Sequence, residues 1–492
     1  MTSRSKILPI LCSVLLWGCS TVAPPGPPVD PRERLRYDID AVLSDSLFVQ
    51  CRASLKVVSL QSGEVLYDRD SKLLARPASN MKLLTTAAAL HELGHDFTFR
   101  TLVFADSLRA DSIVHGNLYI KGFGDPDLNT ADLDSAAVRI KSMGIVQISG
   151  DIVGDNSYFD DLAWGNGWMW DDEPESDEMF ISALSVNRNC IGVFVGPTAM
   201  PGDSVLVACE PPTPYVTIQS TAKTVKDTVV TPLRVSRLFR ERLNTITVRG
   251  EILAGESIRQ HRLSVWKPEL YAAQLLKESL QRNGIAVYGQ PAVGVTPVTA
   301  QPLCERDRPL DSVVVEMNKI SDNLSAENIL KTLGAQKRGL PGTAENGISV
   351  VNGFLSTLGI DTTAHWIADG SGVSHYTLVT VDEIVKLLAA VKKDPEIFPV
   401  FYGSLPIAGV DGTLQHRMIG TDAADNLRGK TGTLSGVSSL SGYVNTRDGE
   451  TLAFSVQMQN FVAPTRFFQL DQDRIGELLA RFSRKRAVAE SR

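Results

Sequence analysis

The chain has 492 residues, of which 43% are hydrophobic and 21% charged, and its formal net charge is -7. Such a length exceeds one ordinary hydrophobic core, so we expect two or three domains, and the composition argues against wholesale disorder. The acidic balance and the lack of a long Lys/Arg block exclude any electrostatic basis for a nucleic-acid partner.

The first predicted element is an export signal. Arg4 and Lys6 supply a positive start, and residues 7–17 form an apolar run that is too short for a comfortable membrane span. Gly18 and Cys19 follow this run, and a small residue before a cysteine at this place resembles a bacterial lipoprotein box. A plain cleaved signal with an incidental Cys19 is the alternative.

We therefore predict a lipoprotein signal peptide over residues 1–18 and a Pro-rich tether over residues 19–32. The protein is expected in the cell envelope or periplasm, attached to the membrane through a lipid on Cys19. Export permits disulfides, but spacing selects no pairing among the four remaining cysteines. They are Cys51, Cys190, Cys209 and Cys304. No Cys/His cluster is present, so we predict neither a metal nor a cofactor.

The next elements are a hairpin and a helix. Residues 53–60 and 65–67 flank a Ser-Gly turn, which is typical of a hairpin. A strongly helical stretch begins at Ser79 and is expected to end at Gly94. Short β-prone runs separated by Gly, Pro, Asp and Asn follow, at residues 98–104, 112–120, 145–153, 213–220 and 245–252.

Helical patterns then return. They cover residues 268–284, 324–333, 347–358 and 381–392, and strand-like runs at 436–445 and 451–459 precede a last helix near 474–483. This order predicts an α/β (α+β) fold, in which a β-rich insertion over residues 97–264 interrupts one catalytic domain. The two parts of that domain are expected at 33–96 and 265–492.

The first motif that can carry chemistry is Ser79-x-x-Lys82. Residues i and i+3 share one face of a helix, so Lys82 Nζ can approach Ser79 Oγ. A lysine in a buried, partly cationic site loses its proton more readily and can act as general base for a serine nucleophile. The same spacing recurs at Ser3 and Ser220, so a surface Ser/Lys pair is the alternative for this motif alone.

The second motif is Ser321-Asp322-Asn323, which precedes a helical pattern. The Ser321 hydroxyl would relay a proton to a leaving amine, and the Asn323 amide would hold Lys82 and the substrate backbone. Serine or aspartate before a helix is also a common N-cap, which is the alternative for this motif.

The third motif, Lys430-Thr431-Gly432-Thr433, leads into a strand-like run. Gly432 would let a substrate backbone approach the strand edge, and an extended peptide could then pair with it as an added strand. Lys430 and the hydroxyls of Thr431 and Thr433 would attract a C-terminal carboxylate. A Gly-containing hairpin is the alternative for the motif on its own.

Together and in this order, the three motifs are the set found in penicillin-binding proteins and class A β-lactamases. The interval between Ser79 and Ser321 is too long for a compact β-lactamase and indicates a large insertion. The chain resembles the D-alanyl-D-alanine carboxypeptidase/endopeptidase family similar to penicillin-binding protein 4 (peptidase family S13). The resemblance covers nearly all of the predicted mature chain, in blocks at residues 76–79, 122–126, 154–159, 369–372, 408–414 and 430–434.

The resemblance implies a penicillin-binding transpeptidase/β-lactamase-like catalytic domain, with an antiparallel sheet flanked by helices and β-rich domains inserted after the serine helix. It implies that Ser79 attacks the carbonyl between the two D-alanines of a peptidoglycan stem peptide. The N–H groups of Ser79 and Thr433 would form the oxyanion hole. Penicillins would inhibit by forming an acyl-enzyme that is hydrolysed slowly.

The resemblance also implies a role for the insertion in substrate binding. Asp155 and Phe159 would reach toward the diaminopimelate end of the substrate, although an ordinary turn aspartate is the alternative for Asp155. His375 stands where the family usually has an arginine that contacts a substrate carboxylate. Histidine is charged only part of the time near neutral pH, so recognition there is expected to be weaker, pH-dependent or different.

Three other functions stay open. The enzyme could act mainly as an endopeptidase on peptide crosslinks, because the same acyl-enzyme serves both reactions. A β-lactamase would need a dedicated deacylating glutamate, and no motif places one. A catalytically inactive envelope-binding lipoprotein is disfavoured because Ser79, Lys82, Ser321, Asn323 and Lys430 are all retained. The oligomeric state is left open.

Overall fold

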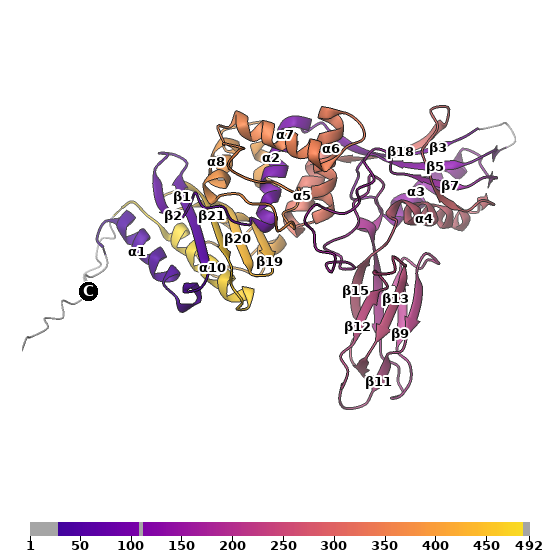
Figure 1. The fold of residues 1–492 in the computed structure, drawn as a ribbon, viewed down its shortest axis with the longest axis horizontal. Helices are drawn as coiled ribbons and strands as arrows, with labels where there is room; N and C mark the ends of the chain where they lie inside the picture. Colours follow the sequence, from indigo (N-terminus) through magenta and orange to yellow (C-terminus); the bar gives the residue numbers. More distant parts are fainter. Residues whose placement is uncertain (1–27, 108–111, 486–492) are drawn as a thin grey trace, which may run out of the picture.

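The computed structural model describes residues 28–107 and 112–485, so Cys19 and the predicted signal lie outside the described residues. The molecule is elongated (Figure 1). One end holds the first and last segments of the described chain, and the other holds the middle segments. Within the described ranges, no helix has the length and apolar character needed to cross a membrane.

A five-stranded antiparallel sheet joins the two ends of the chain. Its order is β19-β20-β21-β1-β2, so β19 is an edge strand. Strand β1, near the start, pairs along its whole length with β21, near the end. The bounds are β1 Arg52–Ser59, β2 Val65–Arg69, β19 Arg428–Leu434, β20 Val437–Asn445 and β21 Thr451–Gln459. Eight of the nine residues of β20 are buried, because helices cover both faces of the sheet.

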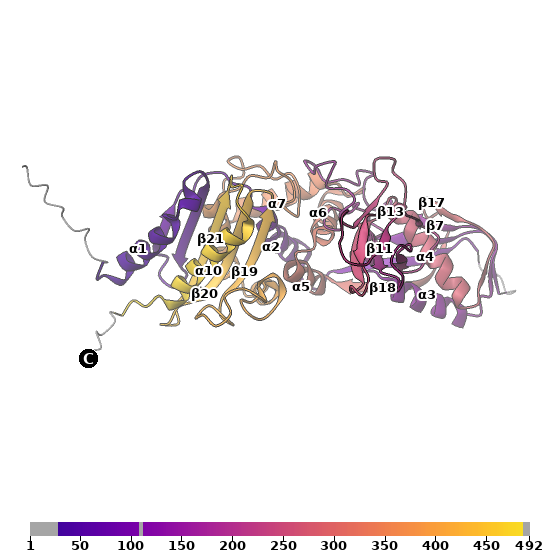
Figure 2. The same ribbon diagram turned by 90° about the horizontal axis from the view of Figure 1, so that it is seen from below.

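The helices form a layer on each face of this sheet (Figures 1 and 2). On one face α10 (Thr465–Arg481) packs against β20 and β21, and α1 (Pro31–Leu43) packs against α10 and β2. The other face carries α2 (Met81–Leu93), α5 (Leu310–Ile320), α6 (Asn323–Arg338), α7 (Ala344–Thr357), α8 (Val381–Val391) and α9 (Phe398–Ser404). The predicted antiparallel sheet flanked by helices is confirmed.

The middle of the chain forms a second sheet with helices and a β-rich lobe. The sheet has the order β17-β7-β5-β3-β18, and α3 (Thr130–Ser142) and α4 (Pro268–Arg282) belong to the same hydrophobic core. Its strands are β3 Thr98–Ala105, β5 Leu118–Gly122, β7 Ile152–Asp155, β17 Pro291–Val293 and β18 Gln301–Pro309. A small sheet of β16 Ala286–Val287, β6 Gln147–Ile148 and β4 Ile113–Val114 extends this region.

The lobe projects away from the long axis of the molecule (Figure 1). It contains three small sheets, β15-β8-β9, β10-β13-β12 and β11-β14. Their strands are β8 Cys190–Gly196, β9 Leu206–Glu210, β10 Thr217–Ser220, β11 Lys223–Val225, β12 Arg234–Arg237, β13 Thr245–Arg249, β14 Glu251–Leu253 and β15 Arg259–Ser264. Cys51, Cys190, Cys209 and Cys304, whose pairing the sequence left open, are free thiols.

The structure bears on the predicted domain borders, which stay predictions. Strand β18 pairs antiparallel with β3 from Gln301↔Ala105 to Pro309↔Thr98. Residues well beyond 264 therefore complete the sheet that β3 begins. We propose that the insertion spans about residues 98–309, since the catalytic helices resume directly afterwards with α5.

Candidate active site

Ser79 lies in a strained turn that joins β2 to α2. The turn is a 3₁₀ segment over Ala78–Asn80, and Ala78 has φ 47°, in the left-handed region that non-glycine residues rarely adopt. Two hydrogen bonds from the sheet side hold the turn. Ser439 Oγ donates to the Pro77 carbonyl at 2.7 Å, and Asn80 Nδ2 donates to the Lys430 carbonyl at 2.9 Å. Strain of this kind persists only where surrounding packing enforces it.

The Lys82 amine lies directly beneath Ser79. Its Nζ atom is 3.0 Å from Ser79 Oγ, 2.5 Å from Asn323 Oδ1 and 2.9 Å from the Ser371 carbonyl oxygen. Ser79 is half-buried, whereas Lys82 is fully buried. Burial lowers the pKa of Lys82 to about 8, although neighbouring carboxylates oppose this shift. A substantial neutral fraction of the amine is therefore present near neutral pH.

The three contacts of Lys82 favour one direction for its lone pair. A neutral amine has two N–H bonds and one lone pair. The Asn323 amide oxygen and the Ser371 carbonyl oxygen accept hydrogen bonds only, so they take both N–H groups. The lone pair then faces the Ser79 hydroxyl. This is the geometry that a general base needs, with nucleophile and base within hydrogen-bond distance.

A second lysine lies on the other side of the Ser321 turn. Lys430 Nζ donates to Ser321 Oγ at 2.8 Å and to the Thr431 carbonyl at 2.9 Å. Lys430 is fully buried. Its burial is the main cause that keeps its pKa well below the usual value for lysine, and the nearby charge of Lys82 lowers the pKa further. Ser321 ends α5 with φ 64°, and Asp322 begins α6 by accepting the Ser325 N–H at 2.8 Å. This turn places Ser321 toward Lys430 and Asn323 toward Lys82.

The third motif lies on the strand itself rather than before one. Thr431, Gly432 and Thr433 are in β19, the edge of the sheet, where Thr431 is half-buried and Thr433 is exposed. Thr431 Oγ1 is 2.7 Å from Thr413 Oγ1 of the neighbouring segment. The five predicted catalytic side chains thus lie in two neighbouring groups beside the edge strand β19. One group is Ser79, Lys82 and Asn323, and the other is Ser321 and Lys430.

Comparisons with known proteins agree with this geometry. Residues 35–474 match the D-Ala-D-Ala carboxypeptidase 3 (S13) family. The chain belongs to this family. The S13 chain is thus a serine D-Ala-D-Ala carboxypeptidase, as the ordered motifs predicted.

Two curated relatives and one solved structure indicate how far the likeness extends. The D-alanyl-D-alanine carboxypeptidase of Actinomadura sp. is 36% identical over 475 residues, which cover 93% of this chain and 86% of the relative. D-alanyl-D-alanine carboxypeptidase DacB of Haemophilus influenzae is 27% identical over 399 residues, which cover 80% of this chain and 83% of the relative. The crystal structure of penicillin binding protein 4 (dacB) from Haemophilus influenzae has a TM-score of 0.81 at 25% identity, covering 90% of this chain and 99% of that chain.

Asp155 and Phe159 are not part of the Ser79 contact set of the S13 chain. The Asp155 side chain is fully buried, lies 3.1 Å from Lys121 Nζ, and accepts the Ser157 and Thr296 N–H groups at 2.9 and 2.7 Å. The hydrogen bonds from Ser157 and Thr296 hold the pKa of Asp155 below the usual value despite burial. Phe159 packs in a buried apolar cluster that joins the insertion to Ala335 of α6. The bond from the Ser157 N–H is the turn contact that the alternative expects, whereas Lys121 and Thr296 come from other segments, and the substrate roles of Asp155 and Phe159 stay predictions.

His375 is half-buried in the turn that follows Asp369-Gly370-Ser371-Gly372. This block was part of the family resemblance, but sequence reasoning gave it no role at Lys82. Trp168 Nε1, from the insertion, donates to Asp369 at 3.1 Å, and Asn323 Nδ2 donates to the Asp177 carbonyl at 2.7 Å. A loop of the insertion therefore reaches the catalytic residues. Its acidic run over residues 171–178 was the only sequence signal for it.

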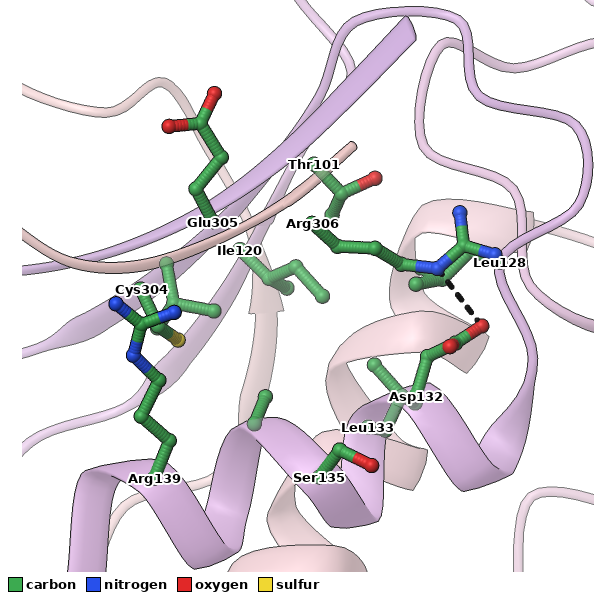
Figure 3. A pocket seen from close by; sticks show the side chains of 12 residues that line it. Thr101, Ile120, Leu128, Asp132, Leu133, Ser135, Arg139, Cys304, Glu305 and Arg306 are labelled. Atoms are coloured by element: carbon green, nitrogen blue, oxygen red, sulfur yellow. Dashed lines mark ion pairs between the residues drawn. The ribbon is translucent and has the colours of Figure 1, made fainter. Parts of the chain in front are cut away.

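A cavity of about 190 Å³ lies elsewhere, in the insertion between α3 and its sheet (Figure 3). Its lining is largely apolar and includes Val103, Ile120, Leu133 and Cys304, with Arg139 and Arg306 at its sides. None of the predicted catalytic residues lines it. This cavity is therefore separate from the candidate site at Ser79.

Proposed function

We propose that this carboxypeptidase removes the terminal D-alanine of peptidoglycan stem peptides through an acyl-enzyme on Ser79. The observation that carries the proposal is the single set of contacts around Lys82 Nζ. Lys82 takes the Ser79 proton as the oxygen attacks the carbonyl between the two D-alanines. The negative charge that develops on the carbonyl oxygen is met by the N–H groups of Ser79 and Thr433.

The leaving D-alanine needs a proton on its amine. Ser321 Oγ supplies it and recovers one from Lys430 Nζ, 2.8 Å away. A water molecule then attacks the acyl-enzyme, and the proton that it loses passes through Ser321 to Lys430. Lys82 returns its proton to Ser79 as the shortened peptide leaves, so both lysines are restored. The substrate peptide lies along the open edge of β19, where Thr431, Thr433 and the charge of Lys430 meet its terminal carboxylate.

His375 is proposed to face the stem peptide rather than the terminal D-alanines. Its turn begins with Ser371, whose carbonyl touches Lys82, so His375 lies close to the site along the chain. Asp155 and Phe159 keep only the support of the sequence resemblance for such a role.

β-Lactam antibiotics are proposed to acylate the same serine. Penicillin binding protein 4 from Haemophilus influenzae has been crystallised in complex with a β-lactam, and its structure has a TM-score of 0.74 with this chain. A β-lactam carbonyl resembles the scissile amide, and its ring opens without releasing a leaving group from the site. The acyl-enzyme is therefore expected to persist.

The test is labelling of the purified enzyme with a fluorescent penicillin, followed by peptide mapping. We expect a stable adduct on the peptide that contains Ser79, and release of D-alanine from a D-Ala-D-Ala stem peptide before labelling but not after it. The variant Ser79→Ala is the control and should take no label. A wild-type enzyme that takes no label, or takes it on another residue, contradicts the mechanism.

Attachment through Cys19 is a separate proposal that rests on the sequence pattern at residues 18–19. A signal followed by a lipidated cysteine would hold an enzyme that acts on the cell wall beside its substrate. Growth with a fatty-acid analogue should label the wild-type chain and the variant Cys12→Ser, but not Cys19→Ser. A mature chain with an unmodified N-terminus at another residue contradicts the anchor.

A further inference from the structure

A buried carboxylate that the proposed mechanism does not use lies behind Lys82. Glu327 is on α6, one helical turn after Asn323, and is 1% exposed. Its carboxylate accepts the Gly370 N–H at 3.0 Å and the Ser371 N–H at 2.8 Å. A charged group this deeply buried is costly unless it is hydrogen-bonded, and the Gly370 and Ser371 N–H groups supply such bonds.

The two N–H groups belong to the segment that contacts the catalytic lysine. Lys82 Nζ donates to the Ser371 carbonyl oxygen at 2.9 Å. Thr85, one turn further along α2, donates its hydroxyl to the Gly370 carbonyl at 2.7 Å. The segment is therefore held from α6 through its N–H groups and from α2 through its carbonyl groups. Glu327 is the only one of these partners that fixes the Ser371 N–H.

The segment also packs closely against the turn that carries the nucleophile. Gly372 has φ 83°, and a Cβ atom built on it would collide with the Ala78 carbonyl oxygen, next to the nucleophile. The segment thus lies tightly against the Ser79 turn, and any shift of it moves both Ser371 and Ala78. The position of the Ser371 carbonyl relative to Lys82 Nζ depends on what holds its far side.

We propose that Glu327 is a positioning residue for the general base: it fixes the Ser371 carbonyl against Lys82 Nζ and so aims the Lys82 lone pair at Ser79 Oγ. The proposal rests on the acyl-enzyme mechanism above. It adds a residue that touches neither substrate nor nucleophile but decides how the base is oriented.

The charge of Glu327 gives a signature that a structural role alone would lack. Burial and the charge of Asp369 raise the pKa of Glu327, but its negative form also raises the pKa of Lys82. The other charged groups that act on Lys82 come from several elements, and they are Asp369, Asp322, Asp177, Glu178 and Lys430. Removing only the Glu327 charge should therefore move the pH at which Lys82 becomes an active base to a lower value.

The experiment measures the rate of Ser79 labelling by fluorescent penicillin against pH. Glu327→Gln keeps the size of the side chain and loses the charge, and its NH₂ group, in the place of Oε2, no longer accepts the Gly370 N–H that lies 3.2 Å from that oxygen. We expect its maximal acylation rate to fall about 10- to 100-fold, as for a small misplacement of a catalytic group, with the midpoint of the acid limb at lower pH. Glu327→Asp should also be slower but keep the midpoint near that of the wild type.

Two further variants separate positioning from folding. Glu383, on α8, is another buried residue whose carboxylate accepts a backbone N–H, that of Thr380 at 2.7 Å. Glu383→Gln removes the charge of this carboxylate. It should cost thermal stability without changing acylation. Thr85→Val releases the segment from the other side, and should slow acylation without moving the midpoint.

The outcomes are distinct. If Glu327→Gln loses stability like Glu383→Gln but acylates at the wild-type rate with the wild-type midpoint, Glu327 is merely structural and the inference is overturned. If Glu327→Gln does not fold, an unchanged rate in both Glu327→Asp and Thr85→Val overturns it. An unlabelled wild-type enzyme would instead refute the acyl-enzyme mechanism itself.

Discussion

Replacing Lys82 by glutamine is expected to slow acylation of Ser79 by about 10²- to 10⁴-fold, because a positioned general base contributes an effect of that size. Glutamine fills much of the same space and can still donate to Asn323 Oδ1 or the Ser371 carbonyl. It cannot accept the Ser79 proton at any accessible pH. The loss should therefore be in the chemical step, and it is measured as the rate of fluorescent penicillin labelling at saturating probe.

The pH dependence of the wild type tests the same assignment. Burial places the pKa of Lys82 near 8, and only the neutral amine can act as base. Below this pH the amine is protonated, so acylation should rise with pH and level off above about 8. Lys82→Gln should lose this limb. A variant that retains the wild-type rate while its thermal unfolding is unchanged would show that another group is the base.

The contacts that rest on local geometry could be predicted from the sequence. Ser79 and Lys82 lie one turn apart on the same face, and Asp322 caps α6 as its residue type and position suggest. The contact between Lys430 and Ser321 was not predicted, because it joins two motifs that lie far apart in the sequence. These five side chains needed no knowledge of the insertion.

The residues that complete the site could not be predicted in this way. Ser371 contributes only its backbone carbonyl, which leaves no residue-type signal, and Glu327 resembles any acidic residue on an amphipathic helix. Asp155 shows a related limit: this aspartate in a conspicuous sequence block contacts Lys121 and two N–H groups, and its substrate role stays a prediction. Sequence alone cannot distinguish a carboxylate that faces substrate from one that closes a turn.

The insertion shows the same limit at the level of the fold. Its strands were expected from short β-prone runs, but α3 was missed because its capping residues, Asn129 and Asp132, lie in a stretch rich in turn formers. The later end that we propose for the insertion rests on the pairing of β18 with β3, which joins segments far apart along the chain. Long-range strand pairing leaves no periodicity in the sequence.

Gly432→Ala is expected to remove most of the activity for a reason that differs from the one suggested by the sequence. Gly432 was expected to make room for the substrate backbone. In the structure a Cβ atom on Gly432 would lie 2.9 Å from both the Pro77 carbonyl oxygen and the Ser79 nitrogen, and would collide with Ser439 Oγ. The missing side chain thus lets β19 pack against the turn that carries the nucleophile.

Backbone atoms on the facing turn cannot move aside as the end of a side chain can, so alanine at position 432 must displace either β19 or the Ser79 turn. A displacement of about 1 Å at the reacting groups costs on the order of 100-fold in rate, and we expect a loss of at least that size in penicillin labelling.

Gly429→Ala is the matched control on the same strand, since its added Cβ would approach only to 3.1 Å of the Leu440 side chain and the Ser441 carbonyl. The double variant Gly432→Ala/Ser439→Ala removes the hydroxyl contact but leaves both backbone contacts in place, so it should not recover activity. Recovery would mean that Ser439 alone requires the glycine, and a Gly432→Ala enzyme with wild-type labelling would show that β19 is not packed this tightly against Ser79.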